Sequence, residues 1–349
     1  MVRGAVVVLA VVLVAACGGD DRATFDTRTT LTALARPATT TTDRATTTIS
    51  AAPQRGRLVV SATGDVNLDP GYIPELAAEG YSYPWSGLQD IFNQDDLTVV
   101  NLECAASDLG EPEAKAFVFR CDPDALDEMA AAGVEVANLG NNHSGDYGKE
   151  ALVDSVRQVE AGGMAAVGAG VDSARAHRAA VFDIDGWTVA VVGFGGVYPT
   201  LDWFATEDRP GMADGDTVET MVATVEAADA VADIVLVTIH WGVELDTAPR
   251  PGDRERAAAL VAAGADAIFG HHAHRLQPLE LVDGVPVFWG LGNFVWPINS
   301  PEGATTGIAQ VVFRPGGGVT ACLLPVTIEE PGHPVLQLDH RPGGPCAAS

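Results

Sequence analysis

Residues 234–242 read Ile-Val-Leu-Val-Thr-Ile-His-Trp-Gly, an apolar run that ends abruptly in the imidazole of His240. A short run rich in β-branched residues predicts a strand buried on both faces. Carboxylate, amide and imidazole groups follow other apolar runs in the same way, and they are the ligands of sites for one or two divalent metal ions. These groups belong to Asp65, Glu103, Asn142, His143, His271, His272 and His274. They are far apart in the chain, so they can meet only if a sheet brings its strand ends together.

The surrounding sequence alternates between predicted strands and predicted helices. Short apolar or β-branched runs predict strands at residues 58–62, 97–100, 134–137, 179–184, 188–192, 234–239, 267–269 and 287–289. Helical spacing predicts helices at residues 124–132, 149–161, 218–232 and 253–263. Residues 308–313 and 319–325, joined through glycines, predict a hairpin. The alternation is typical of a layered α/β domain that binds ligands beyond the carboxyl ends of its strands.

The chain is strongly acidic. Its 349 residues include 20 basic and 47 acidic side chains, which give a formal net charge of −27. Binding to nucleic acid or to a bare anionic membrane requires clustered Lys and Arg, so this balance argues against both. A simpler role for the acid excess is to keep a secreted protein soluble.

The N-terminus is typical of a bacterial export signal. Arg3 precedes an apolar run at residues 5–14 that is too short to span a bilayer comfortably. The next residues, Val14-Ala15-Ala16-Cys17, resemble a lipobox, in which the cysteine is lipidated; a plain secretory signal with a chance cysteine is the alternative. We therefore expect residues 1–16 to be a lipoprotein signal peptide. The protein would be extracytoplasmic and held at the bacterial cell membrane through a lipid on Cys17 alone.

The remaining chain divides into three parts. Residues 17–55 are rich in Thr and Pro and lack periodicity, which predicts a disordered tether. A single folded domain is expected over residues 56–330, followed by a tail over residues 331–349. The sequence leaves the oligomeric state open.

Four cysteines remain if Cys17 carries lipid. An even number outside the cytosol favours disulfides, and four cysteines permit three pairings. We predict the pairs Cys104–Cys121 and Cys322–Cys346, because the members of each pair are close in sequence. Four unpaired thiols are the alternative.

The first two polar clusters each allow an ordinary structural role. Asp65 and Asn67 can place two oxygen ligands on one side of a turn, but Asp and Asn also favour turns for their own reasons. Glu103 can bridge two metals, or it can form an ion pair with Lys115 or Arg120. Either of those basic residues can instead contact an anionic substrate group.

The later clusters are more specific. In Asn142-His143 one residue can hold a metal while the next donates a proton to a leaving oxygen. His240 alone is also compatible with a satisfied core histidine, which Glu244 can orient. His272 and His274 can present two imidazoles from one tight turn, and a chance cluster of three histidines among only eight is improbable.

The ordered set of motifs over residues 57–328 resembles the CapA family of capsule, or poly-γ-glutamate, synthesis proteins. That family's PGA_cap domain is similar to calcineurin-like metallophosphoesterases. The resemblance is carried by Gly64-Asp65-Val66, Asn101-Leu102-Glu103, Lys115 with Phe119-Arg120, Asn141-Asn142-His143, His240-Trp241-Gly242-Val243-Glu244, Ala263-Gly264-Ala265-Asp266, Gly270-His271-His272-Ala273-His274 and Leu291-Gly292-Asn293-Phe294. It implies a metallophosphoesterase-like α/β/β/α sandwich.

The resemblance also implies roles for individual residues. Metal ligands would be Asp65, Asn67 and His274 at a first ion, Glu103 between two ions, and Asn142, His240 and His272 at a second ion. His143 would be the proton donor. Residues that contact substrate or support the ligands would be Lys115, Arg120, Glu244, His271 and Asn293. Asn67 stands where a His is usual and Glu103 where an Asp is usual, so one ion or two remains open.

Two functions from different classes follow. The first is a metal-dependent hydrolase or transferase with one or two Mn, Fe or Zn ions, acting on an anionic cell-surface polymer or a phosphoester. The second is an accessory protein of capsule synthesis or export, in which metal serves structure or polymer binding. A polyanion would be repelled by the net charge except where metal and Lys115, Arg120 or Arg275 make a positive pocket.

Overall fold

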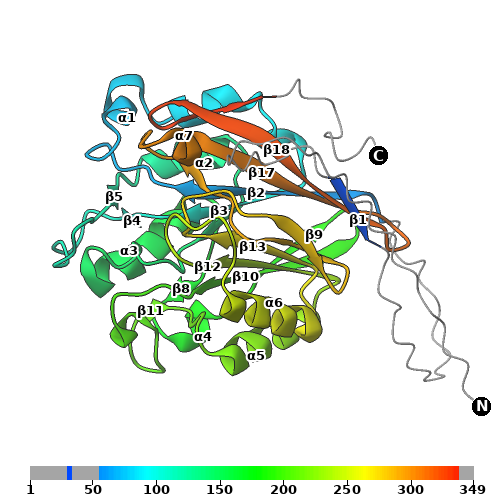
Figure 1. Cartoon of the computed structure of the whole chain (residues 1–349). Coiled ribbons are helices and arrows are strands. Elements are labelled where there is room, and N and C mark those ends of the chain that lie inside the picture. Colours follow the sequence, from blue (N-terminus) through cyan, green and yellow to red (C-terminus); the bar gives the residue numbers. More distant parts are fainter. Residues whose placement is uncertain (1–29, 34–54, 338–349) are drawn as a thin grey trace, which may run out of the picture.

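The computed structural model describes residues 30–33 and 55–337, and two β-sheets lie at its centre (Figure 1). The first sheet contains, in spatial order, β1 (Thr30–Ala33), β18 (Val319–Glu330), β17 (Thr305–Phe313), β2 (Leu58–Val66), β3 (Leu97–Leu102), β6 (Val136–Asn138) and β7 (Ala165–Val167), with β16 (Asn293–Val295) beside β2 and β19 (His333–Leu336) beside β18. The second contains β14 (Leu279–Val282), β15 (Val285–Phe288), β13 (Ala267–His271), β12 (Ile234–His240), β10 (Trp187–Gly195) and β9 (Ala180–Ile184).

The centre of each sheet is parallel. Strands β2, β3, β6 and β7 run parallel in the first sheet, as do β10, β12, β13 and β15 in the second. Antiparallel strands flank both sets, because β17 pairs with β2 and β9 pairs with β10. Two short pairs, β4 (Ala105–Ala106) with β5 (Arg120–Cys121) and β8 (Ala169–Gly170) with β11 (Gly211–Met212), lie outside the main sheets.

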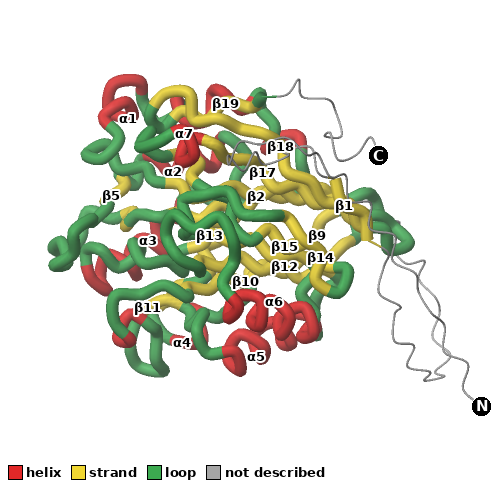
Figure 2. The backbone as a smooth tube through the Cα atoms, in the orientation of Figure 1, coloured by secondary structure: helices red, strands yellow, loops and turns green. Residues whose placement is uncertain are grey.

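Helices cover the outer faces of both sheets (Figure 2). The α-helices are α1 (Pro74–Glu79), α2 (Ala125–Ala131), α3 (Gly148–Ala161), α4 (Ser173–Ala176), α5 (Val218–Asp229), α6 (Pro251–Ala263) and α7 (Pro301–Ala304). Short 3-10 helices are η1 (Tyr83–Leu88), η2 (Phe92–Gln94) and η3 (Leu201–Trp203). The predicted α/β/β/α sandwich is confirmed.

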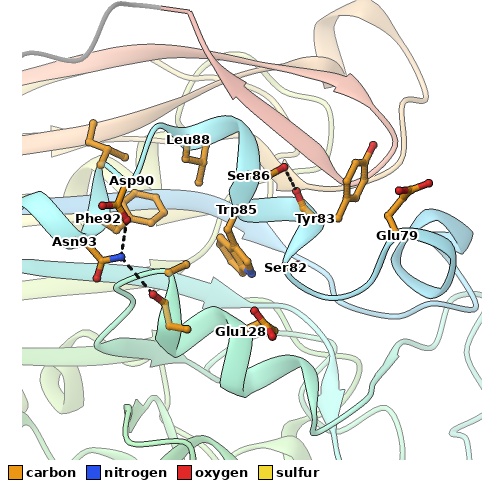
Figure 3. A pocket seen from close by; sticks show the side chains of 13 residues that line it. Glu79, Ser82, Tyr83, Trp85, Ser86, Leu88, Asp90, Phe92, Asn93 and Glu128 are labelled. Carbon is orange, nitrogen blue, oxygen red and sulfur yellow. Dashed lines mark hydrogen bonds between the residues drawn. The ribbon is translucent and has the colours of Figure 1, made fainter.

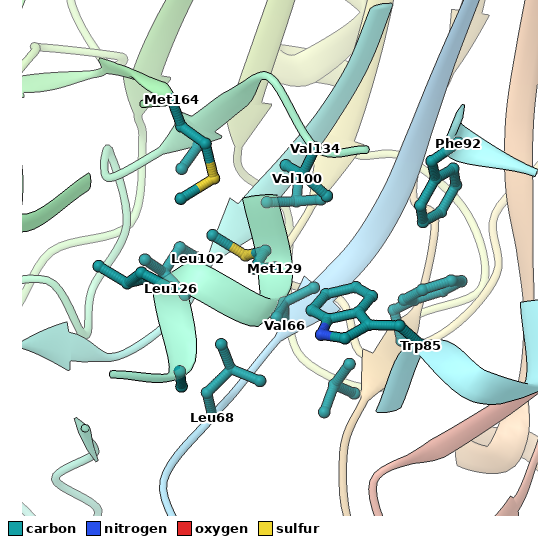
Figure 4. Packing of buried hydrophobic residues seen from close by; sticks show 14 of the residues in the cluster. Val66, Leu68, Trp85, Phe92, Val100, Leu102, Leu126, Met129, Val134 and Met164 are labelled. Atoms are coloured by element: carbon teal, nitrogen blue, oxygen red, sulfur yellow. The ribbon is translucent and has the colours of Figure 1, made fainter. Parts of the chain in front are cut away.

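Alternation of side chains along each strand divides the core into layers. On β2, Leu58, Val60 and Ala62 pack between the two sheets, whereas Val59 and Val66 face the helices of the outer layer. Both faces of the strand are therefore buried, which is why its sequence reads as a nearly continuous apolar run. On the first sheet's outer face, Leu126 and Met129 of α2 pack close to strand residues such as Val100 and Leu102 (Figure 4).

The ends of the domain differ from the prediction. Thr30–Ala33 lies inside the predicted tether but forms β1, antiparallel to β18. The sheet also continues past residue 330, because His333–Leu336 forms β19 on the same strand. Strand β18 is twelve residues long and offers an edge that both short strands use.

The disulfide Cys104–Cys121 is confirmed, with Cα atoms 5.7 Å apart. It joins the segment after β3 to β5 and closes the loop between them. Cys322 lies on β18, but Cys346 and therefore the second predicted pair fall outside the described residues. The predicted signal peptide and Cys17 also fall outside them. Within residues 30–33 and 55–337, no helix has the length and apolar character needed to cross a membrane.

A pocket of about 590 Å³ lies between η1, η2 and α2 (Figure 3). Its walls include the rings of Tyr83 and Phe92 and the carboxylates of Glu79 and Glu128. None of the residues predicted to bind metal or substrate lines this pocket. It is therefore separate from the site described below.

Glu135, just before β6, should make the stability of the domain depend on pH. Its carboxylate accepts a hydrogen bond from the Thr98 amide at 2.7 Å, and burial raises its pKa to about 7. A carboxyl group with a raised pKa binds more protons in the folded state, so stability falls as pH rises from about 4.5 to 7. We expect Glu135→Gln to raise the free energy of unfolding at pH 8 and to leave it nearly unchanged at pH 4. Denaturant titrations at the two pH values measure this. Exposed Glu128→Gln is the control, and an equal gain at both pH values would contradict the expectation.

Candidate metal centre

The candidate centre lies where the apolar layer between the sheets ends. On β3 the side chains of Leu97 and Val99 pack between the sheets, and Asn101 and Glu103 follow at the next alternate positions. The Glu103 amide donates to the Val66 carbonyl at 2.8 Å, which keeps Glu103 in register beyond the strand end. The apolar layer therefore gives way to polar side chains at the carboxyl ends of the strands, as the sequence predicts.

Strand register brings the other predicted residues to the same place. Asp65 on β2 lies opposite Asn101 on β3, and His240 on β12 lies opposite His271 on β13. Gly64 is required before Asp65, because a Cβ there would collide with the Gly292 carbonyl that accepts a bond from the Asp65 amide. Both sheets thus supply polar side chains to one buried space.

Glu103 is at the middle of the cluster. Its Oε1 lies 3.6 Å from His240 Nε2, 3.9 Å from His143 Nε2 and 4.0 Å from His274 Nε2. Asp65 belongs to the same cluster, with Oδ2 at 3.2 Å from His274 Nδ1. The structure therefore brings together two carboxylates and three imidazoles that are dispersed along the sequence.

The donor set suits a divalent cation. Two overlapping groups, Glu103 with His272 and His274, and Asp65 with Glu103 and His240, have candidate ligand atoms within 4.8 Å of one another. Asp65 Oδ2 and Glu103 Oε1 are fully buried and accept no hydrogen bond from the described residues. Two buried carboxylate oxygens without a hydrogen-bond donor are unfavourable unless a positive charge lies close to them, and a bound metal ion supplies that charge.

The two carboxylates differ in acidity. Burial and then the charge of Asp65 raise the pKa of Glu103 well above its usual value. Burial opposes ionisation of Asp65 as well, but the close approach of His274 Nδ1, 3.2 Å from Oδ2, and its charge outweigh burial and hold the pKa of Asp65 below its usual value. Asp65 is therefore the readier anion before any metal binds.

Most of the imidazoles are held neutral, the form that binds metal. Burial lowers the pKa of His271 to about 4, and burial followed by the charge of His274 lowers the pKa of His272 to about 4. Burial, then the charge of His272, lowers the pKa of His240 well below its usual value. His274 differs because Asp65 outweighs its burial and raises its pKa.

The turn that carries the histidine cluster is strained. His272 and His274 have φ angles of 84° and 51°, in the left-handed region that non-glycine residues rarely adopt. Such strain persists where the surrounding structure enforces it, commonly at functional sites. Asn293, predicted as a supporting residue, accepts a bond from His274 Nδ1 at 2.8 Å and donates to the Gly303 carbonyl at 2.9 Å.

His143 is held by a residue that the sequence analysis missed. His143 Nδ1 donates to Asp146 Oδ2 at 2.6 Å, and the same oxygen accepts from the Phe119 amide at 2.8 Å. Lys115 forms an ion pair with the other Asp146 oxygen. This arrangement turns His143 Nε2 toward Glu103. Lys115 pairs with Asp146 and not with Glu103, so the ion pair considered for Lys115 in the sequence is not formed.

Asn142 and its neighbour Asn141 have separate tasks. Asn142 Oδ1 lies 2.7 Å from His240 Nε2, so its amide oxygen faces the cluster. Asn141 Oδ1 accepts from the His143 amide at 3.0 Å, and its Nδ2 donates to the Leu102 carbonyl at 2.8 Å. Asn141 therefore fixes the loop that places Asn142 and His143.

Three predicted residues are placed less directly. Arg120 donates to the Leu109 and Gly110 carbonyls, and its guanidinium stacks 3.6 Å over the Tyr147 ring. Asn67 Oδ1 accepts from the Asp69 amide at 2.9 Å in a local turn. Glu244 is exposed, and its charge helps to raise the pKa of His274 after the larger effects of burial, Asp65 and Asn293. A metal-ligand role for Asn67 and a substrate role for Arg120 stay predictions.

Two further residues near the centre lie outside the predicted set. Asn101 is buried between Asp65 and Glu103, and although it belongs to the Asn101-Leu102-Glu103 motif, the sequence assigns it no role of its own. Arg250, at the start of α6, is near enough for its charge to lower the pKa of His272 after burial and the charges of His274 and His143. It is paired with Asp253 through two nitrogens.

Comparison with known proteins identifies the family of the chain. Residues 59–297 match the family described as bacterial capsule synthesis protein PGA_cap. The chain belongs to the PGA_cap family. A probable polyglutamine synthesis accessory protein of Mycobacterium tuberculosis is 32% identical over 256 residues, which cover 69% of this chain and 67% of that protein. The PGA biosynthesis protein CapA of Bacillus subtilis is 33% identical over 196 residues, which cover 56% of this chain and 51% of that protein.

The solved structures that match the chain are more distant from it in sequence than these two relatives. A putative 5′-nucleotidase of Staphylococcus aureus gives a TM-score of 0.49 at 15% identity, covering 82% of this chain and 55% of that chain. An NAD nucleotidase of Haemophilus influenzae gives a TM-score of 0.48 at 14% identity, covering 82% of this chain and 61% of that chain.

Proposed function

We propose that this PGA_cap protein is a metal-dependent hydrolase or transferase of phosphoester or anionic polymer bonds in the synthesis or processing of a cell-envelope polymer. The observation that carries the proposal is the pair of orphaned, buried oxygens, Asp65 Oδ2 and Glu103 Oε1, surrounded by imidazoles. Mn, Fe and Zn are the ions that this mixture of oxygen and nitrogen ligands suits. The bound ion would be held by Asp65, Glu103, Asn142, His240, His272 and His274.

An ion bound there would polarise the scissile bond and stabilise developing negative charge. His143 supplies proton transfer. Its Nδ1 is fixed on Asp146, so Nε2 is the atom that faces the cluster and can donate a proton to a leaving oxygen. Asp146 holds the ring in one orientation, and although burial lowers the pKa of His143 below its usual value, the hydrogen bond and charge of Asp146 partly offset that loss. The ring also packs on Phe119, with centroids 4.3 Å apart, which restricts its movement.

Positive side chains around the cluster favour an anionic substrate. Lys115 approaches His143 and donates to the Asn142 carbonyl, and Arg275 is anchored to the His274 carbonyl at 2.7 Å. Arg250 adds positive charge on the side of His272. Together they offset the strong negative charge of the whole chain only in the neighbourhood of the ion. Arg250 joins Lys115 and Arg120 as a candidate substrate contact.

The setting of the activity is also proposed. The export signal and Cys17 support a lipid-anchored protein on the outer face of the bacterial membrane, with the polymer or its phosphoester precursor as substrate. A disulfide between Cys104 and Cys121 supports an oxidising compartment. The second candidate function is a non-catalytic accessory role in polymer synthesis or export. The word "accessory" in the name of the Mycobacterium tuberculosis relative favours it.

Metal removal separates the two functions. We expect purified protein to hold a stoichiometric transition metal by mass spectrometry, and to hydrolyse either bis-p-nitrophenyl phosphate or poly-γ-glutamate. EDTA should abolish turnover, and Mn²⁺ or Zn²⁺ should restore it, because the ion supplies the charge stabilisation. Protein that binds metal stoichiometrically but turns over neither substrate would support the accessory function. Protein that binds no metal would contradict both.

A further inference from the structure

A single amide nitrogen contacts three residues of the cluster. Asn101 Nδ2 donates to Asp65 Oδ1 at 2.9 Å and lies 3.5 Å from Glu103 Oε2. It also lies 3.1 Å from His240 Nδ1. Asn101 is fully buried at the end of β3, so water does not compete for these contacts.

The orientation of this amide is fixed from behind. Asn101 Oδ1 accepts from Asn138 Nδ2 at 3.0 Å and from Asn141 Nδ2 at 3.3 Å. Asn138 is itself held, because its oxygen accepts from the Gly140 amide at 3.0 Å. If the Asn101 amide rotated by half a turn, its nitrogen would face two donors and its oxygen would face two carboxylates. The buried network therefore permits one orientation.

The contacts divide the carboxylate oxygens into two kinds. Asp65 Oδ1 and Glu103 Oε2 lie toward Asn101, and Oδ1 also lies 3.8 Å from His271 Nδ1 and 3.9 Å from His240 Nδ1. Asp65 Oδ2 and Glu103 Oε1 have no hydrogen-bond donor from the described residues and lie 3.2 Å from His274 Nδ1 and 3.6 Å from His240 Nε2, respectively. Without a donor between them, two buried carboxylates would repel each other and rotate apart. We propose that Asn101 is a positioning residue that selects which oxygen of Asp65 and of Glu103 binds the ion. The inference rests on the proposed function in one respect, namely that the site binds a divalent ion.

Cobalt binding tests the inference, because the visible bands of Co²⁺ report its coordination. Asn101→Ala should bind Co²⁺ about 10- to 100-fold more weakly than the unmodified chain, the range typical for residues that orient metal ligands. Its bound Co²⁺ should also show shifted bands. Ser155→Ala is the matched control, since it removes a buried hydrogen bond to the Ala151 carbonyl within α3 and should change neither quantity. Circular dichroism establishes that each variant is folded.

Asn101→Asp covers the case in which the alanine variant fails to fold. It keeps an oxygen for Asn138 and Asn141 but replaces the donor with a third carboxylate. Saturating Co²⁺ should therefore raise its melting temperature more than that of the unmodified chain, because the ion relieves added repulsion. Unchanged affinity and bands in the alanine variant, or an equal rise in melting temperature in the aspartate variant, would overturn the inference. If the unmodified chain binds no Co²⁺, the proposed metal site fails instead.

Discussion

Glu103→Gln should reduce the affinity for a divalent ion by more than about 100-fold, because even residues that only orient metal ligands cost about 10- to 100-fold. The substitution keeps the shape of the side chain but removes the charge nearest to three imidazole nitrogens. Hydrolytic activity should fall with it. Isothermal titration with Mn²⁺ or Zn²⁺ measures the affinity directly, and the metal-induced rise in melting temperature provides a second readout.

The same variant should behave in the opposite way without metal. Burial raises the pKa of Glu103 well above its usual value, so the ionised side chain costs stability, and this cost grows as pH rises. Metal-free Glu103→Gln should therefore be more stable than the metal-free unmodified chain at pH 8. Glu135→Gln is the matched control for metal affinity, since it removes a carboxylate that contacts the start of β3 and should leave metal affinity unchanged. Because Glu135→Gln should itself be more stable at pH 8, exposed Glu128→Gln is the control for the metal-free measurement. Full metal affinity in Glu103→Gln would refute a ligand role for Glu103.

His143→Ala should lower kcat by about 10²- to 10⁴-fold, the usual contribution of a positioned proton donor, while metal affinity stays within a few-fold of normal. The ring's Nδ1 is occupied by Asp146, and Nε2 lies 3.9 Å from Glu103, so the side chain serves proton transfer more than ion binding. The loss should be smallest for substrates whose leaving group is a good one, such as p-nitrophenolate, because these need least protonation.

Asp146→Asn gives a matched test of the same arrangement. It keeps the side-chain shape but removes the charge that orients His143 and pairs with Lys115. We expect an intermediate loss of kcat and a shift in its pH profile, with metal content unchanged. If His143→Ala instead lost the metal and kept turnover per bound ion, His143 would be a ligand and not the proton donor.

The layered fold was predictable because its strands are buried on both faces. Runs such as residues 234–239 are almost continuously apolar, which is typical of a strand buried on both faces. The helices between such strands carry apolar residues at helical spacing. Short edge strands were not predictable. Thr30–Ala33 and His333–Leu336 form strands only because the long edge of β18 offers unpaired backbone groups, and no local pattern encodes that edge.

The candidate site was predictable to the extent that its residues follow strands directly. Asp65, Glu103 and His240 stand out because a polar residue interrupts a buried run. Asp146 does not stand out, since an aspartate in a loop is ordinary until the fold turns His143 onto it. The contacts of Arg120 with the Leu109 carbonyl and the Tyr147 ring were likewise not predictable, and its substrate role stays a prediction.

The crosslink between Cys104 and Cys121 has a practical consequence. Cys104 directly follows Glu103, and the loop that the crosslink closes contains Lys115, which touches Asp146 and the Asn142 carbonyl. Whether Cys104 and Cys121 are oxidised therefore affects the shape of the proposed ion-binding site. Recombinant protein made in a reducing cytoplasm would lack this disulfide, so the loop beside Glu103 would be less constrained. Production by export to the periplasm, or oxidative refolding, is the appropriate starting point for any assay.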